Sequence, residues 1–287
     1  MSQLPEEDWD IEIVPKNNLL DLHIKDAWHY RDLLFLLVRR DFVSFYKQTI
    51  LGPVWFFIQP IITILIYNLV FSNLAGIKTD EIPAPLFYLA GTIIWNYFSD
   101  CLTKTSTVFK DNAAVMGKVY FPRLIMPLSI VLSNLIRFAV QFILFLALMI
   151  LYWGKGFQIS PNIILLLFPL LIIIIAALGL GLGMMISAVT TKYRDLAFVV
   201  TFGVPLLMYT TTVIYPLSIA ITKYPAYSWI IKFNPVTAVI ETLRYGFLGK
   251  GSFSWELLGY SSGVTALILL IGIIIFNKVE KTFVDTV

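Results

Sequence analysis

The sequence is poor in charge and in the residues that most metal sites and hydrolytic enzymes need. Only 14% of its 287 residues are charged, against roughly 25% in soluble proteins, while 58% are apolar or aromatic. A single cysteine, Cys101, excludes both a disulfide framework and a cysteine metal cluster. The two histidines, His23 and His29, lie close together near the N-terminus. Water is therefore not the main solvent of this chain, and no metal site is predicted.

Nucleotide-binding and catalytic signals are also missing. The sequence has no G-x-x-x-x-G-K-[ST] loop, so it lacks the usual cradle for ATP phosphates. Gly179, Gly181 and Gly183 follow no strand; the spacing of Gly179 and Gly183 predicts a close helix contact instead. Asp100 and Glu241 have no carboxylate neighbour in sequence, so no catalytic pair is predicted. With a net charge of only +3 there is no nucleic-acid footprint either.

Long uncharged stretches recur along the chain. A bilayer core of about 30 Å is crossed by about 20 apolar residues of helix. The sequence therefore predicts an all-α membrane protein with six transmembrane helices within a membrane domain of residues 52–276. The predicted spans are residues 52–74, 86–102, 124–153, 162–190, 196–215 and 255–276.

The flanking segments, residues 1–51 and 277–287, must lie on the same side of the membrane if there are six spans. The connections on that side carry more than twice as many Lys and Arg residues as those on the other side. Because basic residues are retained in the cytoplasm, both termini are predicted to be cytoplasmic. The acidic first residues contain no apolar run and do not resemble a signal peptide.

Residues 25–47 form a distinct N-terminal segment. Leu33–Val38 is apolar but too short to span a bilayer, and Arg39 and Arg40 follow directly. This pattern favours an interfacial helix on the cytoplasmic leaflet. An ordinary helix packed on the bundle is the alternative.

The connection between the last two spans, residues 216–254, is long and rich in aromatic side chains. Such a segment is poorly suited to lie in water as coil. Pro225 and Pro235 interrupt it, so two short re-entrant helices that cover the outer mouth are predicted.

Ion-driven transporters usually bury several ionisable residues at mid-membrane depth. Here the spans offer Arg137 and, at the end of the second span, Asp100. A single Arg can equally snorkel or pair with a carboxylate or a backbone carbonyl, so proton coupling is the weaker hypothesis.

Several short motifs resemble polysaccharide-export ABC permeases, the family that includes O-antigen, capsule and teichoic acid exporters. They occur in order along nearly the whole chain on the same six-span hydropathy pattern. The motifs are Arg40-Asp41, Tyr46-Lys47-Gln48-Thr49, Leu51-Gly52-Pro53, Trp55, Gln59-Pro60, Phe121-Pro122-Arg123, Tyr193-Arg194-Asp195, Phe233-Asn234-Pro235, Glu280 and Phe283-Val284-Asp285.

The resemblance implies a homodimer bound to two copies of a separate ATPase subunit, which would hold ATP and Mg²⁺. The cargo would be a lipid-linked glycan that moves along the dimer interface. The segment from Lys104 to Lys118 resembles the helix that docks in the ATPase, and a second contact lies nearby; a purely topological role is the alternative. The coupling residues implied are Lys104, Lys110, Asp111, Lys118, Tyr193, Arg194 and Asp195.

A sliding polymer needs weak, repeated contacts, and aromatic faces can provide them without burying charge. The candidate channel residues are Tyr67, Trp95, Tyr97, Phe98, Tyr209 and Tyr215. Aromatic residues in spans also serve as lipid-facing belts or as core packing. Four basic residues could hold a diphosphate at the cytoplasmic entrance, or bind anionic lipid headgroups instead: Arg39, Arg40, Lys47 and Arg123.

The sequence therefore predicts a transport subunit of the bacterial plasma membrane that has no catalytic residues and no cofactor of its own. An ABC permease for a drug or a lipid is one alternative. A membrane glycosyl or phosphoglycosyl transferase is the other.

Overall fold

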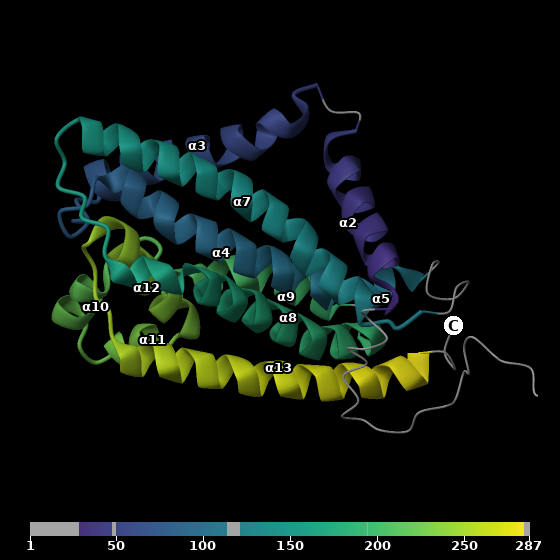
Figure 1. Ribbon diagram of the computed structural model, residues 1–287. Helices are drawn as coiled ribbons and strands as arrows, with labels where there is room; N and C mark the ends of the chain where they lie inside the picture. Colours follow the sequence, from purple (N-terminus) through teal and green to yellow (C-terminus); the bar gives the residue numbers. More distant parts are fainter. Residues whose placement is uncertain (1–28, 48–49, 114–120, 194, 284–287) are drawn as a thin grey trace, which may run out of the picture.

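The computed structural model describes residues 29–47, 50–113, 121–193 and 195–283, and every regular element within these ranges is a helix (Figure 1). Most of the predicted segment 1–51, together with Lys118, Arg194 and residues 284–287, lies outside the described residues. The helices that run along the length of the molecule are α3 (Trp55–Tyr67), α4 (Ala84–Ser106), α7 (Ile125–Gly154), α8 (Phe168–Lys192), α9 (Leu196–Leu207) and α13 (Trp255–Phe283).

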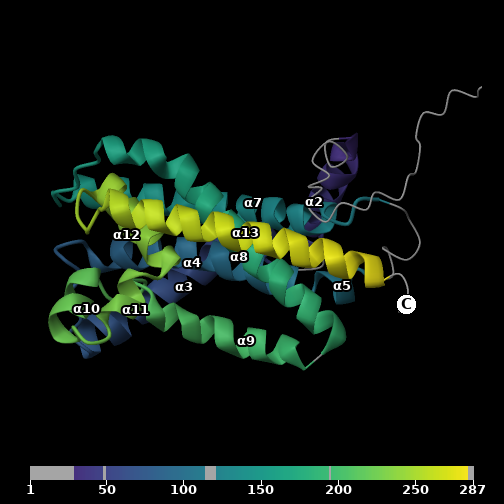
Figure 2. The ribbon, with the colours of Figure 1, turned by 90° about the horizontal axis from the view of Figure 1, so that it is seen from below.

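The bundle has two distinct ends. At one, called here the α2 end, lie α2 (Arg31–Tyr46), the short α5 (Val108–Asp111) and the C-terminal end of α13 (Figure 1). At the other, called the α12 end, lie α10 (Leu217–Lys223), α11 (Ser228–Lys232) and α12 (Pro235–Leu248). Seen from below, α9 starts near the α2 end and ends beside α10 and α11 (Figure 2).

The centre of the bundle is α8, which packs against α4 on one side and α13 on the other. Three glycines allow these close approaches. A Cβ at Gly183 would lie 2.6 Å from Thr105 Cβ, and one at Gly179 would lie 2.9 Å from Cys101 Cβ. A Cβ at Gly181 would lie 2.8 Å from Leu269 Cα on α13. The glycines therefore mark two helix interfaces on opposite faces of α8.

Within the described ranges, four helical segments are long and apolar enough to cross a membrane: Gly52–Leu74, Ile125–Gly154, Ile163–Lys192 and Trp255–Val279. The first combines η1 (Gly52–Val54), α3 and the π-helix η2 (Asn68–Leu74), and the third combines η3 (Ile163–Leu167) with α8. Helix α4 is as long as the first of these segments but carries Asp100 and Lys104. Most of its residues are buried by other helices, so it needs fewer apolar side chains than a helix facing lipid.

The predicted span 196–215 is shorter in the structure. Helix α9 and the following turn η4 (Met208–Thr210) end at Thr210, and Thr211 is extended. The hydroxyl of Thr211 donates to the Met208 carbonyl. The helix thus ends at Thr210, and the expectation that it extends to Tyr215 is wrong.

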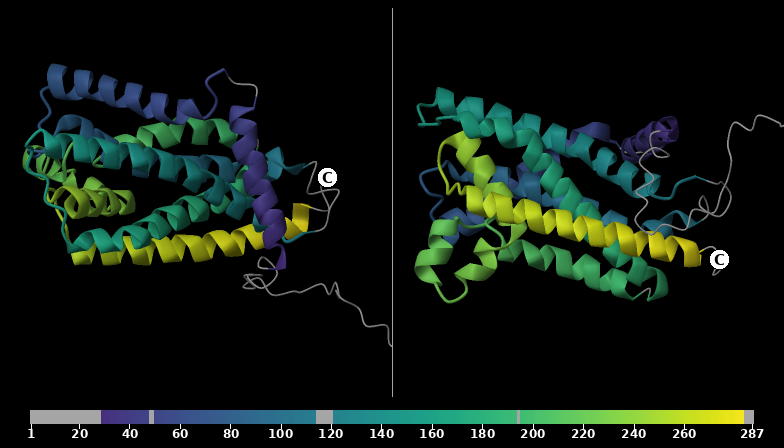
Figure 3. Two further views of the ribbon diagram at one scale, coloured as in Figure 1. Left: turned by 45° about the horizontal axis from the view of Figure 1, so that its top comes forward. Right: turned by 60° about the horizontal axis from the view of Figure 1, so that its bottom comes forward.

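Helix α2 crosses the ends of the long helices (Figure 3). It packs mainly on α7, and Leu37, with 3% of its surface exposed, belongs to a core cluster with Phe109 and Phe276. Phe35 and Leu36, at 65% and 63% exposed, lie on the surface. One side of α2 is therefore anchored in the protein, and apolar side chains remain exposed elsewhere on it.

The connection between α9 and α13 contains three helices where two were expected. Asn234 caps α12 by accepting a hydrogen bond from the Val236 amide, and Pro235 occupies the first helical position. Pro225 comes shortly after the end of α10, and the short α11 follows it. Helix α12 is the longest of the three and is mostly buried against α4 and α13.

Candidate functional site

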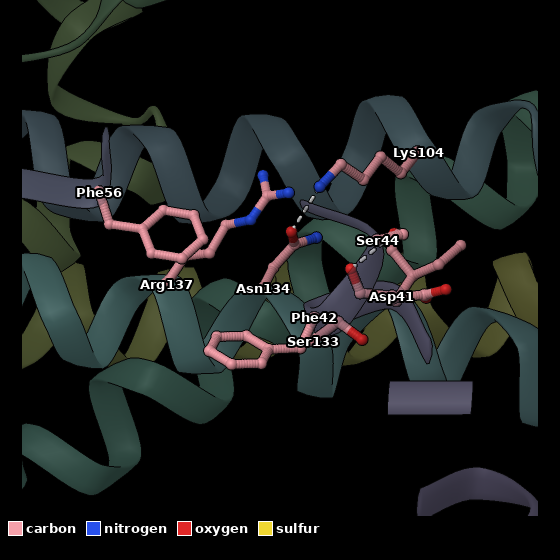
Figure 4. Close-up of a pocket in the computed structure, with 9 residues that line it drawn as sticks. Asp41, Phe42, Ser44, Phe56, Lys104, Ser133, Asn134 and Arg137 are labelled. Atoms are coloured by element: carbon pink, nitrogen blue, oxygen red, sulfur yellow. Dashed lines mark hydrogen bonds between the residues drawn. The ribbon is translucent and has the colours of Figure 1, made fainter. Parts of the chain in front are cut away.

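A polar cavity of about 130 Å³ lies at the α2 end, where α2, α3, α4 and α7 meet. Figure 4 shows the ends of Arg137 and Lys104 converging beside the amide of Asn134, with Asp41 and Ser44 contributed by α2. The remaining walls are apolar or carry a single hydroxyl. The described residues that line it are Asp41, Phe42, Ser44, Phe56, Lys104, Ile130, Ser133, Asn134 and Arg137.

Helical spacing explains how the polar residues come together. Asn134 and Arg137 are three apart on α7, and Asp100 and Lys104 are four apart on α4, so each pair shares one helix face. Because α4 packs on α7, the two faces meet. The Lys104 ammonium donates to Asn134 Oδ1 at 2.7 Å, and Arg137 Nη1 lies 3.4 Å from Asp100 Oδ2.

The charges in the cavity are of mixed sign and close together. Lys104 interacts electrostatically with Asp100, Arg137 and Asp41. The Asp41 carboxylate accepts two hydrogen bonds from Arg40 at 2.8 and 2.9 Å. The Arg137 guanidinium also lies 5.8 Å from the centre of the Phe56 ring.

Ser133 Oγ, in the cavity wall, is buried without a hydrogen-bond partner among the described residues. Asn134 is 2% exposed, and its side chain hydrogen-bonds to the Cys101 thiol of α4. Buried hydroxyl groups without a partner also occur away from the cavity, for example at Tyr88 and Thr265.

None of the predicted entrance residues is among those that line this cavity. Arg39 and Lys47 are exposed, and Arg40 is held by Asp41. Arg123 is half-buried near the start of α7. The cavity cations are instead Arg137, for which the sequence left pairing or snorkelling open, and Lys104, which was assigned to ATPase coupling.

The remaining coupling candidates that the structure describes lie on or near the surface of the α2 end. Lys110 is exposed on α5, and the Asp111 carboxylate accepts from Thr107 at 2.6 Å. Tyr193 is 51% exposed in the turn between α8 and α9, and Asp195 precedes α9.

The six aromatic candidates form separate groups. Tyr67, on α3, donates to Met208 Sδ at 3.7 Å, and the hydroxyl of Tyr215 bonds to the carbonyl of Tyr209, which is itself 53% exposed. These three lie near the junction of α3 with η4. The others, Trp95, Tyr97 and Phe98, are buried on α4 inside the bundle at 5%, 3% and 3% exposed.

A second group of charges, at the α12 end, holds separate segments of the fold together. Arg244 is 0% exposed and donates to the carbonyls of Thr212, Phe87 and Val213 at 2.6 to 3.2 Å. It also lies 3.1 Å from Glu241 Oε1. Sequence reasoning treated these two residues separately, although their spacing of three positions on one helix was the signal for a pair.

A family model described as ABC-2 type transporter matches residues 32–248, more than half of the chain and nearly all of the helices described above. The chain belongs to the ABC-2 type transporter family. Helix α2, both groups of charges and the buried α12 all lie within the matched region.

Curated relatives match over most of their own length. The O-antigen export system permease protein RfbA of Myxococcus xanthus is 27% identical over 265 residues, which is 92% of this chain and 98% of the relative. A protein of the same name from Klebsiella pneumoniae is 26% identical over 88% of this chain and 94% of its own. The polysialic acid transport protein KpsM of Escherichia coli is 23% identical over 82% of this chain and 89% of its own.

Proposed function

We propose that this chain is the permease subunit of an ABC exporter that moves a lipid-linked polysaccharide across the bacterial plasma membrane. The observation that carries the proposal is family membership combined with full-length similarity to relatives named for O-antigen export and polysialic acid transport. The apolar, multi-pass helical bundle supports a membrane location.

In this proposal α3, α4, α7, α8, α9 and α13 are the six membrane spans, with the α2 end in the cytoplasm. Alternation of these helices between the two ends of the bundle supports that assignment (Figures 1 and 2). Helix α2 then lies at the cytoplasmic interface with Phe35 and Leu36 toward the leaflet. Helices α10 to α12 cover the outer mouth, and part of this region dips into the bilayer.

The energy source is a separate ATPase subunit that binds ATP and Mg²⁺. Two copies of it dock on a homodimer of this chain through the α5 region and the turn around Tyr193 and Asp195. The exposed apolar faces of α3 and α9, which include Leu65, Phe198 and Phe202 at 61%, 78% and 72% exposed, provide the surface that forms the dimer and its polymer path. Tyr67, Tyr209 and Tyr215 lie beside that surface.

Deletion of the gene tests the proposal. Cells without the chain should lose surface polysaccharide and accumulate lipid-linked glycan on the cytoplasmic side. Loss of glycan synthesis would instead identify a membrane transferase, and normal surface glycan with altered drug tolerance would identify a permease for another cargo.

The assignment of ATP hydrolysis to a separate subunit has its own test. The purified permease alone should hydrolyse no ATP, and activity should appear only after the ATPase subunit is added. Hydrolysis by the permease alone would contradict it.

A further inference from the structure

A buried hydrogen bond connects α4 with α8 where both helices reach the α2 end. Helix α4 ends at Ser106, and Thr107 separates it from the short α5. The last carbonyls of a helix have no amide partner within that helix, so other groups must serve them. The Ser106 carbonyl accepts a hydrogen bond of 2.6 Å from the hydroxyl of Thr190 on α8. Ser106 is 0% exposed and Thr190 is 6% exposed, so the bond is enclosed by protein.

The contact between the helices is the shorter of two that the Thr190 hydroxyl makes. The same oxygen lies 3.1 Å from the Ser187 carbonyl on its own helix. A hydroxyl has one proton to donate, so the contact of 2.6 Å to Ser106 is the stronger one. Thr191, the next residue, donates to the same Ser187 carbonyl at 2.7 Å. Two neighbouring threonines of α8 therefore share one acceptor within the helix, and Thr190 also bonds to α4.

Apolar packing surrounds this hydrogen bond. A Cβ at Gly183 would lie 2.6 Å from Thr105 Cβ, so α4 and α8 are in close contact at this level. Phe109 of α5 belongs to a core cluster with Met184 of α8, and its ring stacks on that of Phe276 with 4.7 Å between centres. Apolar contacts of this kind are not directional, whereas a hydrogen bond fixes both a distance and an angle. The packing keeps α5 against α8, and the hydrogen bond sets where α5 begins.

The hydrogen bond lies between the two segments that the proposed function assigns to ATPase docking. Ser106 is four residues before Lys110, which is exposed on α5. Thr190 is three residues before Tyr193, which is 51% exposed in the turn after α8. The Tyr193 amide still bonds to the Val189 carbonyl at 2.9 Å, so the start of the turn follows the end of α8. Figures 1 and 2 both show α5 near this end of α8.

We propose that Thr190 is a positioning residue for ATP-driven transport. Its hydroxyl bond to the Ser106 carbonyl keeps α5 and the turn after α8 at a fixed separation, so that both segments respond together when the ATPase moves. The inference rests on the proposed function, which places the ATPase at these two segments. Thr190 itself contacts neither the cargo nor the nucleotide, and it acts through the position of the backbone at Ser106.

The separation of the two segments is measured on the purified full-length permease in detergent. Spin labels at Lys110→Cys and Tyr193→Cys report it by electron paramagnetic resonance, and the native Cys101 is 0% exposed and thus protected from labelling. Thr190→Val replaces the hydroxyl by a methyl group of similar size and should shift or broaden the distance distribution. Thr190→Ser keeps the donor and should retain the wild-type distribution.

The matched control is Thr191→Val. It removes a hydroxyl bond to the same Ser187 carbonyl but leaves the bond to α4 in place, so the distance distribution should stay unchanged. If Thr190→Val yields no folded protein, Thr190→Ala is compared with Thr190→Ser in its place. A wild-type distribution without the Thr190 hydroxyl overturns the proposal, as does equal broadening in Thr191→Val.

The role in transport is measured in cells as surface polysaccharide at matched amounts of permease in the membrane. Thr190→Val should lower export by about fivefold, the factor that corresponds to one hydrogen bond of about 1 kcal/mol. Thr190→Ser and Thr191→Val should both export at nearly the wild-type level. A residue that only stabilises the fold would change the unfolding midpoint and leave the label distance and the export per folded molecule unaltered. Normal export by Thr190→Val therefore overturns the positioning role even where the distance changes.

The outcome is separable from that of the proposed function. If gene deletion abolishes surface glycan but Thr190→Val exports normally, the positioning role is wrong and the export function stands. If deletion leaves surface glycan unchanged, the export function is wrong and the positioning role falls with it, whatever the label distances are.

Discussion

The two ends of the molecule use buried charge in opposite ways. At the α12 end, Arg244 and Glu241 are almost fully enclosed, and three backbone carbonyls and Ser252 add hydrogen bonds to the pair, although Arg244 Nε has no partner among the described residues. At the α2 end, Arg137 and Asp100 meet through one 3.4 Å contact at the edge of a cavity. The first arrangement holds α12 against α4 and the segment after α9. The second is more open, so charge is enclosed by protein at one end and borders a cavity at the other.

The largest effect should follow from breaking the enclosed pair. Arg244→Met leaves the Glu241 carboxylate buried without its cation, which typically costs about 3–5 kcal/mol. We expect a large fall in the unfolding midpoint in detergent, or no folded protein. Arg137→Met should cost much less because Asp100 can remain hydrated.

The double variant Glu241→Gln/Arg244→Met separates charge from packing. It should recover part of the stability lost in Arg244→Met because no unpaired charge stays buried. Equal instability of the single and double variants would show that the lost carbonyl bonds, not the ion pair, hold α12 in place.

A smaller loss of stability is expected from replacing either of two glycines, one at each end of the bundle, that share a left-handed backbone conformation. Gly249 ends α12 at φ 71°, and a Cβ there would lie 2.1 Å from Ser160 Oγ. Gly52 has φ 52°, but a Cβ would meet no described atom within 4 Å. Gly52→Ala should therefore cost only backbone strain, about 1 kcal/mol, and Gly249→Ala more.

Thermal unfolding of both alanine variants in the same detergent measures the difference. Similar midpoints would mean that the Ser160 segment moves away from Gly249 at little cost. In that case the α12 end would be less tightly packed than the enclosed Arg244 indicates.

How well the sequence predicts the position of a helix depends on what surrounds that helix. Segments that the rest of the chain leaves largely exposed carry the full hydropathy signal, so 52–74 and 124–153 lie within two residues of the helices found. Helix α4 is enclosed by protein and can carry Asp100 and Lys104, which makes its ends harder to place. The extended backbone of Thr211 ends the helix before Tyr215, and hydropathy does not register such a change.

The sequence could not predict the cavity, for a different reason. Its lining comes from four helices far apart in the chain, and only the packing of α4 on α7 brings Lys104 to Asn134. Ser133 is an unremarkable polar residue in an apolar span and carried no signal. The Phe233-Asn234-Pro235 motif was found, but its evident role here is to cap and start α12.

The buried Ser133 hydroxyl beside the cavity should contribute nothing to stability. Ser133→Ala removes a buried hydroxyl without a partner among the described residues, so the free energy of unfolding should stay unchanged or rise by up to about 1 kcal/mol. The matched control on the same helix is Ser129→Ala. Ser129 donates to the Met126 carbonyl at 2.8 Å, and its removal should lower stability slightly. A clear loss of stability in Ser133→Ala would show that its hydroxyl is satisfied in the folded protein.

The smallest effect concerns an exposed ion pair at the α12 end. The Lys250 ammonium bonds to Glu81 and lowers the pKa of that carboxyl below its ordinary value of 4.5. A carboxyl with a lowered pKa stabilises the fold above its unfolded pKa, and this contribution disappears as the pH falls through the folded pKa. Lys250→Gln should therefore lower the unfolding midpoint slightly at neutral pH, and the difference from wild type should vanish in acid once Glu81 is protonated. High salt should shrink it as well, since both groups lie at the surface. A difference that persists in acid would mean that Lys250 stabilises the loop through its aliphatic chain, and that the charges at this surface contribute nothing comparable to the enclosed Arg244.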